Sequence, residues 1–153
     1  MYITKVAKSD LARKWALPDR VFFACGACHI LAHTLIQRFP ERGFRAIWIK
    51  PRTGYIGNHV VAVSANEAFD YHGITDWSRL FDHTRRKARM WWPGWDADLI
   101  GLLPDVLVSG PKSRTYEGLW LREPGQFLHD PLPRAHRFID RLIFARPSTL
   151  LTA

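Results

Sequence analysis

The sequence has few cysteines, no long apolar run and an excess of basic over acidic side chains. Its two cysteines are too few for a disulfide framework, which excludes the small secreted scaffolds that several disulfide bonds hold together. No stretch approaches about 18 consecutive apolar residues, so no membrane span is predicted. Residues 1–14 alternate charged and apolar side chains and lack the apolar segment of a signal peptide. We therefore expect a cytoplasmic protein, although export by a signal-independent machine would leave no trace in the sequence.

The remaining composition is typical of a folded domain. The chain has 153 residues, of which 47% are hydrophobic and 24% are charged. Disorder is therefore a poor interpretation, and we expect a single domain over residues 1–153. Lysine and arginine number 22 against 14 aspartates and glutamates, which gives a net charge of +8. Such a charge favours an anionic partner, namely a nucleic acid, a membrane surface or an acidic protein.

Apolar spacing and turn residues predict a mixture of helices and antiparallel strands. Apolar residues recur at helical spacing after Ala27, and Phe39-Pro40 ends this helix. Residues 101–133 are rich in glycine and proline and are expected to form short strands or loops. The other expected elements are a short helix from Leu11 to Trp15, a brief apolar run at 21–24, strands at 44–50, 59–64 and 67–72, and helices at 76–90 and 133–145. The expected fold is α+β, with a central helix packed on an antiparallel sheet of at least three strands.

The segment Cys25-Gly26-Ala27-Cys28-His29 fits several motifs. As C-x-x-C-H it matches the attachment signature of c-type haem, with His29 as the axial ligand. As C-x-x-C after a short apolar strand it matches a thioredoxin-like redox site. Together with His33, its two cysteines and its histidine also offer four zinc ligands. We rank these three interpretations below a fourth, in which Cys28 is a nucleophile.

Three short segments resemble the papain-like cysteine hydrolases. Cys25-Gly26-Ala27-Cys28 is similar to the family's C-G-[SA]-C at the start of the central helix, where the second cysteine is the nucleophile. Asn58-His59-Val60-Val61 looks like the strand start that carries the family's general-base histidine. Asp70, in Ala68-Phe69-Asp70-Tyr71, fits the polar residue that orients this histidine. The resemblance covers about residues 21–73.

Because Cys28 and His59 are only 31 residues apart, the resemblance implies a minimal member of the wider papain-like and transglutaminase-like group. That group includes peptidases, amidases, deamidases and acyltransferases. The resemblance implies a papain-like fold and hydrolysis or acyl transfer at an amide of a protein or peptide substrate, without metal or cofactor. Cys28 would be the nucleophile, His59 the general base and then acid, and Asp70 the residue that orients His59. A small basic enzyme of this kind would suit an effector or a toxin.

The residues themselves support this assignment on physical grounds. A cysteine in the first turn of a helix has its thiolate favoured by the helix dipole, and a neighbouring imidazolium favours it further. If residues 65–66 form a two-residue turn, His59 lies opposite His72, and Asp70 shares the face of both because side chains alternate along a strand. A slip by one residue would place Asp70 on the other face. The predicted triad therefore depends on this register.

Two interpretations from other classes remain open. One is a nucleic-acid-binding protein or nuclease with structural cysteines, because the helix at 76–90 has a basic side next to a tryptophan-rich loop. Its residues are Arg79, Arg85, Arg86, Lys87 and Arg89, followed by Trp91, Trp92 and Trp95. The other is a non-catalytic host-interaction protein, in which Cys28 is a small buried apolar residue. Within the hydrolase interpretation, His72 and His83 are alternative bases that we rank below His59.

Overall fold

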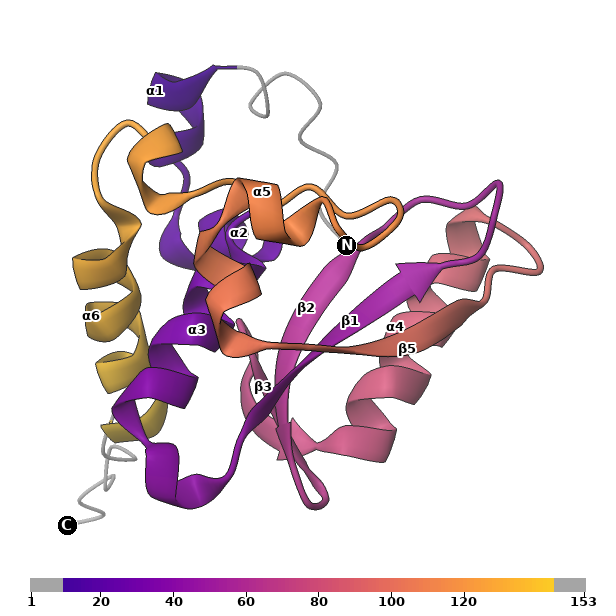
Figure 1. The fold of residues 1–153 in the computed structure, drawn as a ribbon. Coiled ribbons are helices and arrows are strands. Elements are labelled where there is room, and N and C mark those ends of the chain that lie inside the picture. Colours follow the sequence, from indigo (N-terminus) through magenta and orange to yellow (C-terminus); the bar gives the residue numbers. More distant parts are fainter. Residues whose placement is uncertain (1–9, 145–153) are drawn as a thin grey trace, which may run out of the picture.

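The computed structural model describes residues 10–144, which form a five-stranded antiparallel sheet with helices packed on both faces (Figure 1). The strands are β1 (Arg45–Pro51), β2 (His59–Ser64), β3 (Glu67–Asp70), β4 (Gly73–Asp76) and β5 (Ala97–Leu102), in the spatial order β4-β3-β2-β1-β5. The α-helices are α1 (Leu11–Trp15), α2 (Asp19–Ala24), α3 (Cys28–Arg38), α4 (Trp77–Trp91), α5 (Gly110–Ser113) and α6 (Pro131–Phe144). Short 3-10 helices are η1 (Pro40–Arg42), η2 (Pro104–Val108) and η3 (Pro124–Gln126). The predicted α+β class is confirmed at this level.

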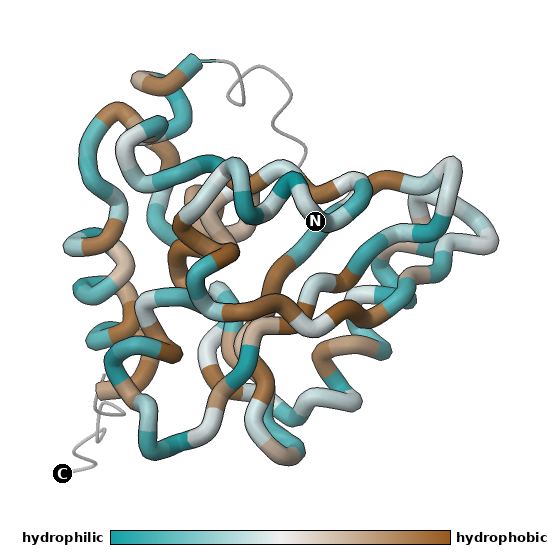
Figure 2. Tube along the Cα trace, in the orientation of Figure 1, coloured by the Kyte–Doolittle hydropathy of each residue, from teal (hydrophilic) through white to brown (hydrophobic). Residues whose placement is uncertain are grey.

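The larger part of the core lies between α3 and the sheet. Helix α3 is apolar around most of its surface, and its side chains Ile30, Leu31 and Leu35 are almost completely buried. They pack with Phe22 and Phe23 of α2 and with α6, which is hydrophilic on its outer side and hydrophobic toward α3 (Figure 2). Burying one such side chain contributes roughly 1.5–3 kcal/mol. This face of the sheet therefore holds α3 firmly in place.

Among the helices of residues 10–144, α4 is the one that covers the opposite face of the sheet. Helix α4 begins at the capping residue Asp76, whose carboxylate accepts a hydrogen bond from the Arg79 N–H at 3.0 Å. Among its residues only Leu80 and Ala88 are buried. They pack with Trp95, which is fully buried and donates its indole N–H to the Ile56 carbonyl at 2.9 Å. This second core is much smaller than the first.

The β2–β3 hairpin has the predicted register. Strand β2 spans the predicted residues, and Ser64 pairs with Glu67 across a two-residue turn. Ala65 of that turn has a positive φ of 49°, a backbone conformation typical of hairpin turns that match the twist of the strands. Since β2 and β3 are in this register, His59 and Asp70 point to the same face, as expected.

Several expected boundaries are wrong. The apolar run at 21–24, taken as a strand in the thioredoxin-like interpretation, belongs to helix α2, which follows Pro18 and has Asp19 in its first turn. The third strand ends at Asp70, and a fourth strand begins at Gly73 after a tight turn in which Gly73 has φ of 97°.

The Gly- and Pro-rich region contains loops, as expected, and also short helices that were not expected. Strand β5 ends at Leu102, and the chain from Pro104 to Gln126 contains short helical turns in place of strands. The last helix begins at Pro131, two residues earlier than predicted, and its predicted end at residue 145 lies outside the described residues, as do residues 1–9. None of the described helices is long and apolar enough to cross a membrane.

Candidate active site

Cys28 is the first residue of α3 and lines a cavity of about 600 Å³. The chain turns from α2 into α3 at Gly26, whose φ of 97° is available to glycine at little cost. A Cβ at this position would lie 2.8 Å from the Lys14 ammonium, which would have to shift. The Cys28 side chain is buried, and its sulfur accepts a hydrogen bond from the Val60 N–H at 3.4 Å. This contact ties the helix start to the start of β2.

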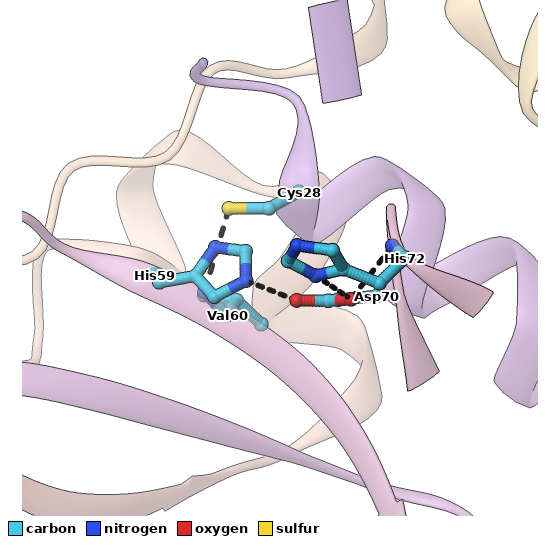
Figure 3. Close-up of polar contacts among 5 residues, drawn as sticks. All are labelled: Cys28, His59, Val60, Asp70 and His72. Atoms are coloured by element: carbon cyan, nitrogen blue, oxygen red, sulfur yellow. Dashed lines mark hydrogen bonds and ion pairs between the residues drawn. The ribbon is translucent and has the colours of Figure 1, made fainter. Parts of the chain in front are cut away.

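His59 is the first residue of β2 and stands beside the Cys28 sulfur (Figure 3). Its Nε2 donates to Asp70 Oδ2 at 3.0 Å, which leaves Nδ1 directed toward the sulfur, as Figure 3 shows. Asp70 ends β3, and its side chain is 3% exposed. The structure thus brings the three predicted residues Cys28, His59 and Asp70 together at one end of the sheet.

His72 holds the other oxygen of Asp70. Its backbone N–H and its ring Nδ1 both donate to Asp70 Oδ1, at 2.8 and 3.0 Å. His72 is therefore in contact with the carboxylate, and Asp70 lies between His72 and His59 (Figure 3). This geometry favours His59 over His72 as the base for Cys28. His83, the other alternative base, stacks edge-on against His72 at a ring distance of 6.0 Å.

The residues of the candidate triad come from opposite faces of the sheet. Cys28 belongs to the α3 side, whereas His59 and Asp70 share their faces of β2 and β3 with side chains that pack under α4. The α3-side residues of the hairpin are Val60, Ala62 and Phe69, and the α4-side residues are Val61, Val63 and Ala68. Side chains from the two faces can meet only where a strand ends. Cys28 and His59 do so at the start of β2.

Burial and hydrogen bonding have opposite effects on the charges at this site. Burial disfavours the thiolate, but hydrogen bonds from His29 and His59 and their positive charge outweigh it and hold the pKa of Cys28 well below the usual value. Burial also opposes a charged His59, yet its hydrogen bonds to Asp70 and Cys28 raise the pKa of His59 to about 10. Although Asp70 is buried as well, hydrogen bonds from His59 and His72 lower its pKa. These shifts favour a thiolate, an imidazolium and a carboxylate in a row.

His29 is a neighbour of Cys28 that the sequence did not indicate in this role. Its side chain is buried, and Nε2 donates to the Arg122 carbonyl at 2.7 Å. The ring is thereby fixed from a loop that follows it by 93 residues. In the sequence His29 suggests only a haem or zinc ligand, because its partner loop cannot be located from local spacing.

The predicted zinc ligands are not assembled into a site. No group of three or more His, Cys, Asp or Glu side chains within residues 10–144 is arranged to hold a metal ion. Cys25 caps the end of α2, whereas Cys28 starts α3, and neither is in a disulfide bond. The thioredoxin-like interpretation expects a strand before Cys25, where the structure has a helix.

The basic side of α4 is only partly available to a partner. Arg85 lies 3.6 Å from Asp96 and over the ring of Phe81, and Arg89 donates to the Trp95 carbonyl at 2.8 Å. The exposed members of the basic side are Arg79, Arg86, Lys87 and Arg89, and Trp91 beside them is also exposed. Trp95 is in the core, so the expectation that it contacts a partner is wrong.

Comparison with known proteins adds no relative from which a function could be transferred. No family model, curated protein or solved structure matches the chain.

Proposed function

We propose that the protein is a cysteine-dependent hydrolase or acyl-transfer enzyme that acts on an amide of a protein or peptide. The observation that carries the proposal is the row Cys28–His59–Asp70 at the wall of the cavity (Figure 3). A buried thiol with a lowered pKa next to an oriented imidazolium is typical of an activated nucleophile. The resemblance to the papain-like group leads to the same three residues, and we propose this group as the family.

In the first half of the reaction, the Cys28 thiolate attacks the carbonyl carbon of the amide. A carbon–sulfur bond forms, and the carbonyl π electrons move onto oxygen to give a tetrahedral oxyanion. The C–N bond then breaks while the His59 imidazolium gives its proton to the leaving nitrogen. The products are a free amine or ammonia, a thioester on Cys28 and a neutral His59.

The second half returns the enzyme to its starting state. Neutral His59 accepts a proton from water, or from the amine or alcohol that is the acyl acceptor, and the resulting nucleophile attacks the thioester. Expulsion of the Cys28 thiolate releases the acid or the transferred acyl product. Asp70 stays ionised throughout, holds the Nε2–H of His59 and stabilises its charged form.

The start of α3 supplies the groups that would stabilise the oxyanion. No side chain caps this helix, and the Ile30 N–H donates to the Ala27 carbonyl at 3.1 Å, so the N–H groups of Cys28 and His29 are left for another acceptor. The N–H of Cys28 is the nearest of them to the reacting carbonyl because it belongs to the nucleophile itself. Such preorganised donors are worth roughly 10²–10³-fold in rate each.

Alkylation with iodoacetamide tests the proposal without knowledge of the substrate. We expect Cys28 to react rapidly at pH 6–7, because its thiolate persists there, and Cys25 to react slowly. In the variant His59→Ala, Cys28 should react slowly, because burial then raises the pKa of the thiol. Mass spectrometry of the labelled peptides separates the two cysteines. Equal and slow labelling of both cysteines that His59→Ala leaves unchanged would refute the proposal.

Nucleic-acid binding is the second candidate function, favoured by the exposed basic residues of α4 beside the exposed Trp91. Binding through phosphate contacts weakens steeply as salt rises. Titration of random DNA and RNA at several salt concentrations measures that slope. The triple variant of Arg79, Arg86 and Lys87 to glutamine should reduce the slope by about three if the face binds phosphates. Absence of binding at low salt would exclude this function.

A further inference from the structure

The carboxamide of Asn58 is oriented by a buried tryptophan. Trp48 is 1% exposed, and its indole N–H donates to Asn58 Oδ1 at 2.9 Å. An indole nitrogen can only donate, so the carboxamide oxygen faces Trp48 and the amide nitrogen Nδ2 is turned away from it. Among residues 10–144, Nδ2 has no hydrogen-bond partner. Because Asn58 is exposed and lines the cavity, both Nδ2 hydrogens are available to a substrate.

Asn58 also lies on the same side of the sheet as the proposed nucleophile. Trp48 packs in the core under α3, so its bond to Asn58 places the carboxamide on the α3 face, where Cys28 begins the helix. Two residues after Asn58, the Val60 N–H donates to the Cys28 sulfur at 3.4 Å. Two residues of chain span at most roughly 7 Å. Asn58 and the sulfur are therefore close neighbours in one cavity wall.

The position of Asn58 in the chain identifies the part of the substrate that its donors face. Asn58 directly precedes His59, and in the proposed reaction His59 gives its proton to the leaving nitrogen. The leaving group is therefore the part of the substrate nearest to His59 and to its neighbour Asn58. In a peptide bond the leaving nitrogen carries an α-carbon and a carbonyl, whose oxygen accepts hydrogen bonds. Ammonia, which leaves from a primary amide, offers no such carbonyl.

We infer that Asn58 Nδ2 donates a hydrogen bond to the carbonyl oxygen of the residue that follows the scissile bond. The inference rests on the proposed function and specifies its substrate class, which is a main-chain peptide bond in place of a side-chain primary amide. The site then cleaves peptides or transfers an acyl group to the amino group of a peptide. Ile56, which is 58% exposed and lines the cavity from the same loop, offers apolar contact to the residue that follows the scissile bond.

Acyl transfer to small amines tests this inference without the natural substrate, because an attacking amine occupies the place of the leaving group. With p-nitrophenyl acetate as acyl donor, the Cys28 thiolate attacks the carbonyl carbon, a carbon–sulfur bond forms, and p-nitrophenolate leaves with the electron pair. An amine then attacks the thioester, its proton passes to neutral His59, and the Cys28 thiolate is expelled. Two amines compete as acceptors. Glycinamide has the carbonyl, and propargylamine has similar basicity and the same N–C–C skeleton without it.

We expect the ratio of acetylglycinamide to acetylpropargylamine to exceed the ratio that S-acetylglutathione gives with the same amines without enzyme. One hydrogen bond accounts for roughly a fivefold excess. Asn58→Asp should lower the ratio to that of S-acetylglutathione. A carboxylate still accepts the Trp48 N–H, so the fold should be kept, but it has no hydrogen to donate. Asn58→Leu removes the donor without adding a charge and should give the same ratio.

The control variant Asn66→Asp makes the same change at the other asparagine of the chain. Asn66 lies in the turn at the far end of the β2–β3 hairpin, outside the cavity lining within residues 10–144, so the ratio should not change. Both products come from one acyl-enzyme, so an effect of a variant on the acylation of Cys28 cancels in the ratio. If Asn58→Leu does not fold, Asn58→Asp decides alone. A wild-type ratio in Asn58→Asp, or in folded Asn58→Leu, overturns the inference.

The acyl donor separates failure of the inference from failure of the proposed function. If mass spectrometry finds no acetyl thioester on Cys28 of the wild-type protein, the proposed function is refuted and the inference falls with it. If the thioester forms but is passed to neither amine, or to both at the ratio of S-acetylglutathione, the inference alone is overturned. A preference for glycinamide that disappears in both Asn58 variants supports it.

Discussion

The two faces of the sheet differ in how much of the core they contain and in what they contribute to the site. The α3 face has a large core built from α2, α3 and α6, and it carries Cys28, the proposed nucleophile. The α4 face has a small core under one amphipathic helix, and the hairpin residues that point to it end in His59 and Asp70. The position of the sulfur therefore depends on many packing contacts, whereas the position of the base depends on the register of one hairpin and a few hydrogen bonds.

This difference teaches how a site can be both firmly placed and sensitive to single changes. The sulfur and the imidazole are joined across the end of the sheet by the Val60 N–H and by the chain of hydrogen bonds to Asp70. Removing a reacting group on either side should disable the chemistry with little loss of stability, whereas truncating a core side chain should cost more stability on the α3 side than on the α4 side. The following predictions test this separation.

The largest expected effect is that of Cys28→Ala. Loss of the nucleophile should reduce turnover of an amide substrate by at least roughly 10⁴-fold, because the covalent intermediate cannot form. The melting temperature should change little, since the substitution removes only one sulfur at the cavity wall. Turnover and thermal unfolding, measured on the same preparation, distinguish loss of chemistry from loss of folding. A folded Cys28→Ala protein with full activity would remove Cys28 from the mechanism.

His59→Ala should reduce turnover nearly as much as Cys28→Ala. The dependence of wild-type activity on pH should show that His59 acts in its protonated form. The active form needs a thiolate and an imidazolium together, so activity should fall as pH rises through about 10, where His59 loses its proton. The raised pKa also stabilises the fold: this contribution is complete below about pH 6.5 and is lost as pH rises through 10. Turnover and chemical denaturation between pH 6 and 10.5 measure both effects. A loss of activity near pH 7 in place of pH 10 would contradict the assignment of His59 as the proton donor.

Asp70→Asn should cost less than His59→Ala, on the order of 10²-fold in turnover, because an amide oxygen can still accept the Nε2–H of His59. Without the carboxylate, the pKa of His59 should fall, and the upper limb of the pH profile should move down with it. His72→Ala serves as the matched comparison, since it removes the other ring from Asp70 and leaves His59 in place. If His72→Ala were as damaging as His59→Ala, the base would be His72.

The smallest effects concern stability alone and compare the two faces directly. Leu35→Ala in α3 should destabilise the protein by about 3–5 kcal/mol, because a fully buried side chain leaves a cavity in the large core. Leu80→Ala in α4 should cost about 2–3 kcal/mol, near the lower end of such changes, because the small core under α4 can relax around it. Urea unfolding measures both values. Equal losses would show that the two faces contribute equally.

The site residues within the helix start and the hairpin could be predicted because local rules determine their placement. Gly26 and the apolar period place the start of α3 at Cys28, and a two-residue turn fixes the register that puts His59 and Asp70 on one face. The same rules did not find β4, because Gly73–Asp76 is only four residues long and lacks a clear alternation of apolar and polar side chains. They also failed at 21–24, where a short apolar run fits a strand and a buried helix equally well.

The cavity wall could not be predicted from local sequence. Lys14 belongs to a five-residue helix, and Arg122 lies in a segment that was expected to be loops or short strands. The proximity of Lys14 to Phe127 results from packing between segments more than 100 residues apart. His29 acquires its role in the same way, through the carbonyl of Arg122. Tertiary packing of this kind leaves no periodic signal in the sequence.

The link between His29 and the Arg122 carbonyl has a consequence for the order in which the protein matures. It closes a loop of 93 residues, so it can form only after most of the chain has left the ribosome and folded. Until then Cys28 has neither the buried histidines nor the helix start that favour its thiolate, and it behaves as an ordinary thiol of low reactivity at neutral pH. Under the proposed function, the growing chain would thereby be protected from premature oxidation or acylation, and Cys28 would become reactive only when folding is complete.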